Sequence, residues 1–360
     1  MGMIKRKMLE KQSFFGRKAS NMSGYMNLES ISKLGVNIPL LVENEKTKGT
    51  ALANPSVLKI DDELFVNIRM LNYTLYHSIG AKEWMDEGGK FASRWGPLTY
   101  VHPENDARLV TDNFVGCWDD NDTKFNKINM ACDTKSLWSF AGLEDGRLVK
   151  WDGSIYITGV RRDTTENGQG RMELSKLSRI STRPTELSRV RIEHPTDPSA
   201  YCEKNWMPVR DLPYHFVMDA NPTRLVKANP KTGNCKIVFE GKELPIDGNM
   251  RGSSQIIKNN DGFFAIVHDT NWWRFEGRCD ENKDAIYSHR MVQWDKDFVV
   301  QKVSKKFTFM DGQIEFCCGM DRLNGDFYIT FGFEDNSAHM LKVGCDVLDR
   351  WFDNNLEYSA

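Results

Sequence analysis

The stretch GLEDGRLVKWDGSIYI, residues 142–157, decides how the fold of this chain is interpreted. Two runs of strand-forming residues flank the dipeptide Asp152-Gly153. An Asp-Gly pair favours a tight hairpin because both central positions of the turn need a positive φ, which these residues tolerate. An acidic pair, Glu144-Asp145, and Arg147 stand just before the first strand. The stretch therefore predicts a β-hairpin with charged side chains at its open end.

The same turn-and-strand pattern recurs along the chain, with different charged residues at its ends. Four further hairpins are predicted, within residues 57–69, 222–239, 255–267 and 320–331. The member at 222–239 is the least regular, because its turn is the longer segment Asn-Pro-Lys-Thr-Gly. Five irregularly spaced hairpins favour an all-β fold, a five-bladed β-propeller with a polar axial pocket. A two-sheet sandwich is the alternative.

The chain shows no composition shift typical of a linker between independent domains. Residues 1–35 are polar and basic without a clear period, and they are predicted to form an N-terminal arm. Residues 36–360 are predicted to form a single five-bladed propeller domain. Helical periodicity is limited to short segments near residues 26–33 and 346–354.

Charge and cysteine content exclude several classes of protein. The chain has 48 basic and 50 acidic residues and a formal net charge of −2, so no single-sign field would attract nucleic acid. No apolar run approaches the ~20 residues that a membrane span needs. The eight cysteines form neither a disulfide framework nor a metal-type spacing, which favours reduced thiols in a cytoplasmic protein. The sequence leaves the oligomeric state open.

Charged and aromatic residues at the predicted strand ends are the candidate site residues, because in a propeller these ends converge on the central channel. Glu315 adds to them, since a carboxylate inside an apolar run must be paired or functional if it is buried. The candidates are Arg69, Glu144, Asp145, Arg147, Lys204, Asn205, Trp206, His268, Tyr287, His289, Arg290, Glu315 and Asp335. Taken alone, each of them fits a surface ion pair or a turn cap better than a catalytic group, and the signal is their recurrence at equivalent places in the hairpins.

Familiar nucleotide, metalloprotease and serine-hydrolase motifs are absent from the sequence. Histidines and carboxylates do not cluster with metal-ligand spacing. The sequence therefore predicts neither a metal nor another cofactor.

The segment Glu144-Asp145-Gly146-Arg147 resembles the Glu-Asp-Pro-Arg hallmark of glycoside hydrolase family 130, with Gly in place of Pro. Other matches resemble further family positions. They are Arg69 at the end of a first-blade strand, Lys204 before the third blade, Gly252-Ser253-Ser254 with Val267-His268-Asp269, and the closing segment 331–335. The segments EKNWMP, YSHRMV and IEFCCGM also resemble propeller modules of bacterial surface-glycan glycosyltransferase proteins.

The resemblance implies an inverting enzyme on β-mannoside-like sugars, either a glycosyltransferase or a phosphorylase. It implies that Asp145 is the acid/base and that it acts through a substrate hydroxyl. An inverting phosphorylase needs only one carboxylate, together with cations that hold phosphate. These cations are expected to come from Arg69, Arg147, Lys204, His268 and His289, with Trp206 or Tyr287 stacking on a sugar.

Two alternatives remain open on the sequence alone. In a hydrolase, Glu315 or Asp335 would serve as the base that activates water. A propeller that binds glycans without turnover is the other. The expected partners are an oligosaccharide, a sugar phosphate or a sugar nucleotide, with inorganic phosphate as a possible co-substrate.

Overall fold

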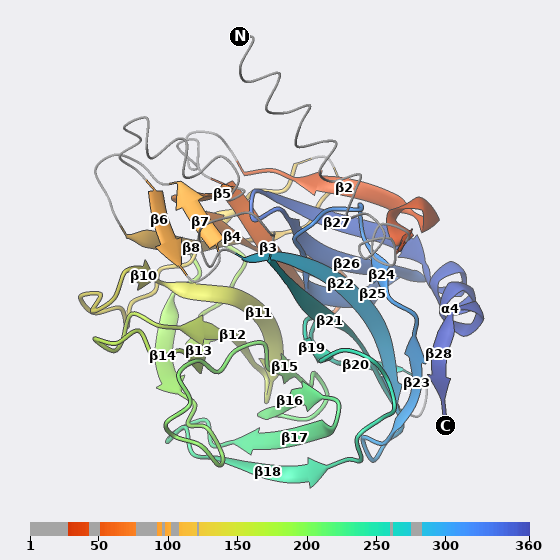
Figure 1. The fold of residues 1–360 in the computed structure, drawn as a ribbon. Helices are drawn as coiled ribbons and strands as arrows, with labels where there is room; N and C mark the ends of the chain where they lie inside the picture. The colour runs from red at the N-terminus through yellow and green to blue at the C-terminus, as the bar shows by residue number, and fades with distance from the viewer. Residues whose placement is uncertain are drawn as a thin grey trace, which may run out of the picture.

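The computed structural model describes residues 28–42, 51–76, 92–95, 98–101, 108–120, 122–259, 262–274 and 283–360. Within these residues the strands form six sheets, and five of them have four or more strands. These five sheets lie around a common axis, each with one edge toward the centre (Figure 1). The prediction of an all-β propeller is confirmed.

The first three blades follow one another in sequence. Blade one contains β3 (Ala51–Ile60), β4 (Glu63–Leu71) and β8 (Leu109–Cys117), with β9 (Asn126–Lys127) and β10 (Phe140–Ala141) paired to β8. Blade two contains β11 (Leu143–Trp151), β12 (Ser154–Arg161), β13 (Arg171–Leu177) and β14 (Glu186–Arg191). Blade three contains β15 (Met207–Pro208), β16 (His215–Ala220), β17 (Thr223–Ala228) and β18 (Cys235–Glu240).

The last two blades also recruit strands from the two ends of the described chain. Blade four contains β19 (Arg251–Gly252), β20 (Ile257–Asn259), β21 (Gly262–Arg274), β22 (Lys283–Trp294) and β23 (Val300–Ser304), extended by β24 (Phe307–Thr308), β1 (Glu29–Ser30) and β28 (Leu356–Ser359). Blade five contains β25 (Glu315–Leu323), β26 (Asp326–Phe333), β27 (Ser337–Gly344) and β2 (Val36–Leu40). A small sheet beside blade one holds β5 (Thr74–Tyr76), β6 (Ala92–Trp95) and β7 (Leu98–Val101).

All five predicted hairpins coincide with paired strands of the structure. The turn at Asp152-Gly153 has φ values of 48° and 72°, which is the left-handed geometry that an Asp-Gly pair tolerates. The less regular hairpin at 222–239 is β17 with β18, the outer pair of its blade, whereas the others lie at the inner edges of theirs. The turn residues 260 and 261 of the fourth hairpin lie outside the described residues.

Apolar side chains fill the space between neighbouring blades and close the ring. Five buried clusters each join two successive blades, and one of them joins blade five to blade one. In that cluster Val57 and Val66 of blade one pack with Tyr328 and Met340 of blade five. Because each blade is buried on both faces, its strands are apolar almost throughout, as in β26.

Residues near the start of the described chain pack onto the last two blades. Strand β2 pairs antiparallel with β27, and β1 pairs with β24. A 3₁₀ helix, η1 (Ile31–Leu34), buries Ile31 in the cluster between blades four and five. Residues 28–35 of the predicted arm therefore contact the body, while residues 1–27 lie outside the described part. The division of the chain into arm and domain stays a prediction.

One α-helix, α4 (Cys345–Asn354), lies within the described residues, where the sequence showed short helical periodicity. Its apolar face packs on blade five through Leu348, Trp351 and Phe352. This helix is too short to span a membrane, and the described chain holds no other α-helix.

Polar side chains tie the inner strands together at the end of the axis away from Asp145. The Gln255 amide donates to the Val57 carbonyl and accepts from Met320 N–H at 3.2 Å, so one side chain links three blades. The buried Asp321 carboxylate accepts from Lys59 N–H at 2.5 Å and forms an ion pair with Arg210. These contacts fix the inner strands that present the site residues at the other end.

Candidate active site

Asp145 lies on a β-bulge near the start of β11. The pairing with β12 shifts register between Glu144 and Arg147, and Asp145 has a φ of 53°. A bulge of this kind redirects a side chain that regular pairing would place elsewhere. A Cβ at the adjacent Gly146 would lie 2.7 Å from Ile157 Cδ1 and 2.9 Å from Asn113 Oδ1, so a larger residue would force these side chains to shift. Glycine at this position therefore fits the local packing without such a shift.

Two residues of blade one hold the Asp145 carboxylate. Arg69 Nη1 lies 2.9 Å from Oδ1, and the Asn54 amide donates to the same oxygen at 2.7 Å. Oδ2 accepts no hydrogen bond from the described residues. Burial alone raises the pKa of Asp145, but the positive charges of Arg69, Lys204 and Arg147 outweigh it and lower the pKa below its ordinary value. The group is therefore a carboxylate with one oxygen available.

Arg69 is itself fixed by its neighbours. Its Nε donates to Thr111 Oγ1 at 2.8 Å and its Nη2 to the Tyr73 hydroxyl at 2.7 Å. Glu144 lies 3.6 Å from the same Nη2. These contacts hold the guanidinium in one orientation, which favours a precise ion pair with Asp145.

Arg147 connects blade two to blade four beneath the site. Its Nε donates to the Ser253 carbonyl at 2.5 Å, and its Nη1 to the Asp145 carbonyl at 2.9 Å. The side chain is fully buried, and Nη2 has no hydrogen-bond partner in the described structure. Ser253 Oγ lies 3.0 Å from His268 Nδ1, so the same short segment also orients a histidine. Arg147 therefore fixes the backbone beneath Asp145 and contributes positive charge to the site from a buried position.

Lys204, Tyr287 and Asp335 complete the charged group. None of their side chains forms a hydrogen bond or ion pair with the described residues. Burial raises the pKa of Asp335 to about 6, with repulsion from Asp145 adding to it and attraction from Arg69 and Lys204 opposing it. The pKa of Lys204 is raised despite burial, through Tyr287, Asp145 and Glu144, so the ammonium stays charged.

His268 acts as a neutral group. Burial, together with Arg251 and other nearby cations, places its pKa well below the ordinary value. Its ring stacks on Tyr287 with centroids 5.5 Å apart and meets Phe316 edge-on at 4.9 Å. The positive charge around Asp145 therefore comes from arginine and lysine, and the imidazole can supply a hydrogen bond but no charge.

The structure gives Glu315 and His289 surroundings that do not support their predicted roles. Glu315 is fully buried and accepts hydrogen bonds from the backbone N–H groups of Phe309, Met310 and Gly312. His289 is fully buried beside Phe309, and burial lowers its pKa to about 3. Glu315 therefore organises a loop, and His289 packs as a neutral core side chain.

Trp206 and Arg290 likewise pack in the body of the protein, which does not support sugar stacking or anion binding by them. The Trp206 indole is buried between blades two and three and donates to Glu203 at 3.3 Å. Arg290 is buried in an ion pair with Asp269 at 3.1 Å and a second one with Glu357. A predicted strand end alone did not distinguish such residues from those that face the axis.

Asn205 lies where blade three meets blade four. Its backbone has a φ of 67°, and its buried side-chain oxygen has no hydrogen-bond partner in the described structure. A Cβ on Gly252 would lie 2.0 Å from the Asn205 carbonyl, so β19 approaches this residue as closely as only glycine allows. Asn205, which follows Lys204 in the sequence, therefore lies close to Arg251, the residue before Gly252.

Sequence reasoning missed Asn54 and Arg251. Asn54 has a φ of 43° at a register shift in β3, and the following Pro55 was the sequence signal for that irregularity. Arg251 opens β19 and pairs with His268, and its side chain makes no hydrogen bond or ion pair with the described residues. Arg251 directly precedes the segment Gly252-Ser253-Ser254, which the sequence analysis had singled out, so that segment was the signal that could have pointed to it.

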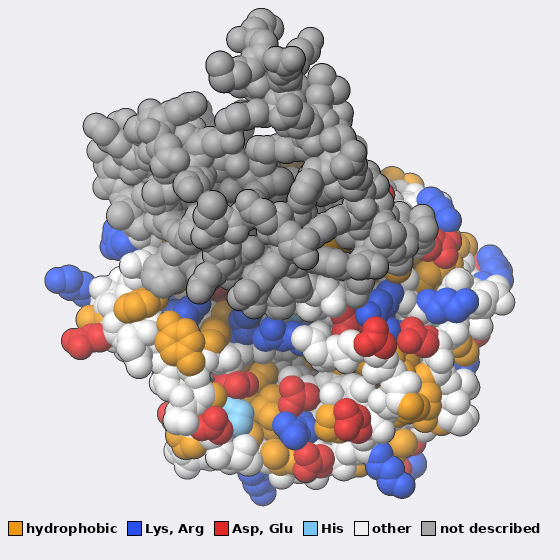
Figure 2. Space-filling view, viewed as in Figure 1, with side chains coloured by type: hydrophobic (Ala, Val, Ile, Leu, Met, Phe, Trp, Pro, Cys, Tyr) orange, Lys and Arg blue, Asp and Glu red, His pale blue; other side chains and the backbone are white. Residues whose placement is uncertain are grey.

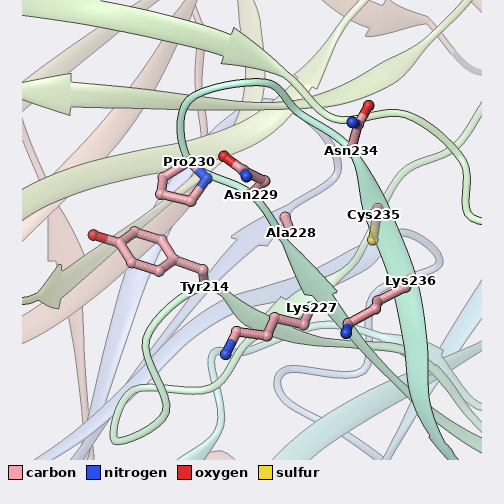
Figure 3. A pocket seen from close by; sticks show the side chains of 8 residues that line it. All are labelled: Tyr214, Lys227, Ala228, Asn229, Pro230, Asn234, Cys235 and Lys236. Carbon is pink, nitrogen blue, oxygen red and sulfur yellow. The ribbon is translucent and has the colours of Figure 1, made fainter.

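Charged side chains of both signs gather near the middle of the face seen in Figure 2. A separate pocket of about 400 Å³ lies on the outer hairpin of blade three (Figure 3). It is lined by residues such as Tyr214, Lys227 and Lys236, and by none of the predicted site residues. Within the described residues, His, Cys, Asp and Glu side chains form no group of three or more suited to a metal ion.

No protein-family model matches this chain, and no curated protein matches it in sequence. Solved structures do match it over most of its length. This chain shares the fold of the glycoside hydrolase family 130 enzymes. At identities of 11–14% the similarity establishes the fold and leaves the activity to be tested.

Three of these structures illustrate the similarity. A β-1,2-mannobiose phosphorylase from Listeria innocua, in complex with β-1,2-mannobiose, is 12% identical, covers 85% of this chain and 92% of its own, and has a TM-score of 0.51. A mannose phosphorylase from Leishmania mexicana, in complex with phosphate ion, is 11% identical, covers 97% and 98%, and has a TM-score of 0.52. A structure from the study of family 130 hydrolases that target β-1,2 mannosidic linkages in Candida mannan is 14% identical, covers 82% and 85%, and has a TM-score of 0.54.

Proposed function

We propose that this protein is an inverting carbohydrate-active enzyme that transfers a β-mannoside-like sugar to or from an anionic group, with Asp145 as the acid/base. The observation that carries the proposal is the Asp145 carboxylate, held on Oδ1 by Arg69 and Asn54, with Oδ2 available. Around it lie Lys204 and Arg251, whose side chains make no hydrogen bond or ion pair with the described residues. Support comes from similarly folded proteins solved with mannobiose and with phosphate.

Lys204 and Arg251, which are only partly buried, are the groups proposed to hold the anion. Arginine and lysine bind phosphate oxygens through charge-assisted hydrogen bonds. Neutral His268, beside Tyr287, is proposed to donate a further hydrogen bond. A sugar phosphate or inorganic phosphate fits such a set of donors, whereas a neutral ligand would leave these charges unpaired.

In the cleavage direction, a phosphate oxygen attacks the anomeric carbon and the bond from that carbon to the bridging oxygen breaks. The leaving oxygen takes a proton that Asp145 supplies through a substrate hydroxyl. In synthesis, Asp145 takes the acceptor proton while phosphate leaves. The lowered pKa of Asp145 in the ligand-free protein suits its role as the base in synthesis. An anion beside Lys204 and Arg69 would offset their charge and raise that pKa, which favours the acid role.

Asp335 favours hydrolysis as the second candidate function. An inverting hydrolase needs a second carboxylate to activate water. Asp335 is a half-buried carboxyl near Asp145 with no partner among the described residues and a pKa of about 6. Release of free mannose without phosphate, lost in Asp335→Asn, would assign hydrolysis.

Product analysis by NMR tests the proposal. The protein is incubated with mannose 1-phosphate or GDP-mannose and a panel of sugar acceptors, and separately with β-1,2-mannobiose, with and without phosphate. A new glycosidic bond or phosphate-dependent cleavage, lost in Asp145→Asn, is the expected result. Asp152→Asn, in an exposed turn, is the matched control and should behave as wild type. Turnover that survives in Asp145→Asn, or no turnover of any of these substrates, would overturn it.

A further inference from the structure

The loop of residues 192–206 crosses the end of blade two that carries Asp145, and several hydrogen bonds hold it in place. Strand β11 begins at this end with residues 143–145, β12 ends there at Arg161, and β13 begins there at Arg171. The loop 192–206 starts after the outer strand β14 and leads to the inner strand β15 of blade three. It carries Lys204 of the candidate site and, three residues earlier, Tyr201.

Tyr201 presents an aromatic ring at the surface of this loop. The residue is 52% exposed. Arg162 supports it from below, with its guanidinium 5.3 Å from the ring centroid and its Nη2 donating to the Tyr201 hydroxyl at 2.9 Å. The same guanidinium lies 5.2 Å from the Phe140 ring centroid. Arg162 is thus held between two rings, and Tyr201 stands on it in a fixed orientation.

Hydrogen bonds from the buried Arg171 side chain and from the Gly170 N–H fix the backbone around Tyr201. Arg171 is 2% exposed, and it donates to the Ala200 and Pro198 carbonyls, each at 2.6 Å. No carboxylate in the described residues pairs with it. Gly170 N–H donates to the Tyr201 carbonyl at 2.9 Å, which closes the support. Ordering a loop costs conformational entropy. An exposed tyrosine held in place by this many contacts therefore calls for a functional explanation.

The tyrosine lies next to the candidate active site. Glu144, the neighbour of Asp145, pairs with Val160 two residues before Arg162. The Cys202 thiol, adjacent to Tyr201, lies against Gly170 and is close enough to Lys204, Arg162 and Glu144 to feel their charges. The ring therefore stands on the blade-two side of the group that surrounds Asp145.

We propose that Tyr201 is a stacking platform for a pyranose ring, and that it forms a second sugar subsite beside Asp145. This inference rests on the proposed function for the identity of the ligand class. Apolar C–H faces of a pyranose pack on an aromatic ring, while its hydroxyls bind the polar groups around it. The platform would hold the second sugar of a β-mannoside, the part that acts as acceptor or leaving group, and it would take no part in phosphate binding.

The test compares Tyr201→Ala and Tyr201→Phe with wild type in two assays. Saturation-transfer NMR titration measures the Kd for mannose, β-1,2-mannobiose and β-1,2-mannotriose. The activity assay measures KM for mannobiose and, separately, for phosphate. Leu187→Ala, an exposed apolar residue on the outer strand of the same blade, is the matched control. Circular dichroism and the melting temperature verify that each variant is folded.

We expect Tyr201→Ala to weaken mannobiose and mannotriose by about three- to tenfold, the range typical of one aromatic contact. The Kd for mannose, the KM for phosphate and kcat should change by less than about twofold. Tyr201→Phe keeps the ring but loses the hydroxyl that accepts from Arg162, so it should weaken oligosaccharide binding less than Tyr201→Ala does. A purely structural role of Tyr201 would instead lower the melting temperature of both variants and shift every constant together, which would overturn the platform.

Two further outcomes separate this inference from the proposed function. If Asp145→Asn abolishes turnover while Tyr201→Ala leaves every oligosaccharide constant unchanged, the platform is overturned and the function stands. If the wild type has no turnover but binds mannobiose through Tyr201, the platform stands and the protein is a glycan-binding propeller. Failure of wild type to bind any of the three sugars overturns the platform.

Discussion

Arg69 and Asp145 are 76 residues apart in the sequence, yet their side chains meet at 2.9 Å across the interface of blades one and two. Both residues are almost completely buried. Removing one member of such a pair leaves an uncompensated charge, which commonly costs about 3–5 kcal/mol. The pair therefore links the proposed chemistry at Asp145 to the stability of the ring.

Arg69→Met is expected to lower the free energy of unfolding by about 3 kcal/mol, because Asp145 loses its charged partner. The pKa of Asp145 should rise in this variant, since the attraction of Arg69 is the strongest influence that lowers it. Urea unfolding measures the first effect, and NMR titration of the labelled Asp145 side chain measures the second. Arg183→Met, an exposed arginine of blade two, serves as the control. An unchanged Asp145 pKa would contradict the role given to the ion pair.

Gly146→Ala is expected to destabilise the protein by about 1–3 kcal/mol, as overpacking of a filled site does. The new Cβ would lie 2.7 Å from Ile157 Cδ1. Ile157→Val removes that methyl group, so the double variant should recover part of the loss. Urea unfolding of both single variants and the double variant gives the coupling energy. Strict additivity would show that Ile157 is not what excludes a side chain at position 146.

Asp335 should make a measurable contribution to the pH dependence of stability. Its folded-state pKa of about 6 exceeds the ordinary unfolded value of about 3.9, so protonation favours the folded state. The stabilising contribution is complete below pH ~4 and is lost as the pH rises through about 6. The difference in unfolding free energy between wild type and Asp335→Asn, measured from pH 4 to 7.5, should show this decline. A flat difference would place the pKa of Asp335 at its ordinary value.

Glu315→Gln is expected to reduce stability by about 1–3 kcal/mol without reducing turnover. The carboxylate accepts three backbone N–H groups, and an amide would turn its NH₂ group toward one of them. Chemical unfolding and steady-state kinetics of the same preparation separate the two effects. A loss of turnover beyond a hundredfold in a folded variant would instead return Glu315 to the list of catalytic groups.

Most of the fold could be predicted from the sequence because its signals are local. An Asp-Gly or Asn-Gly pair at a turn, with alternating or continuous apolar runs on both sides, specifies a hairpin through residues next to one another. The two such hairpin turns that lie wholly within the described residues, at 152–153 and 324–325, have the positive φ values that this chemistry implies. The repetition of hairpins then favoured the propeller.

The candidate site could be predicted only in part. Arg69, Asp145 and Lys204 were recognisable as charged residues at strand ends. His289 and Trp206 had the same appearance in the sequence, but neighbouring blades bury them. Asn54 carried no charge to mark it, although its amide donates directly to the Asp145 carboxylate.

The sequence by itself determined the strands, their turns and the charged residues at their ends, since each depends on neighbours along the chain. Only the tertiary structure decided which of those residues meet. Contact between Arg69, Asn54 and Asp145 depends on how two blades pack around the axis, and burial of His289 depends on aromatic residues from another strand. Free energies of burial and charge pairing are set by neighbours in space, and those neighbours exist only after the ring has closed.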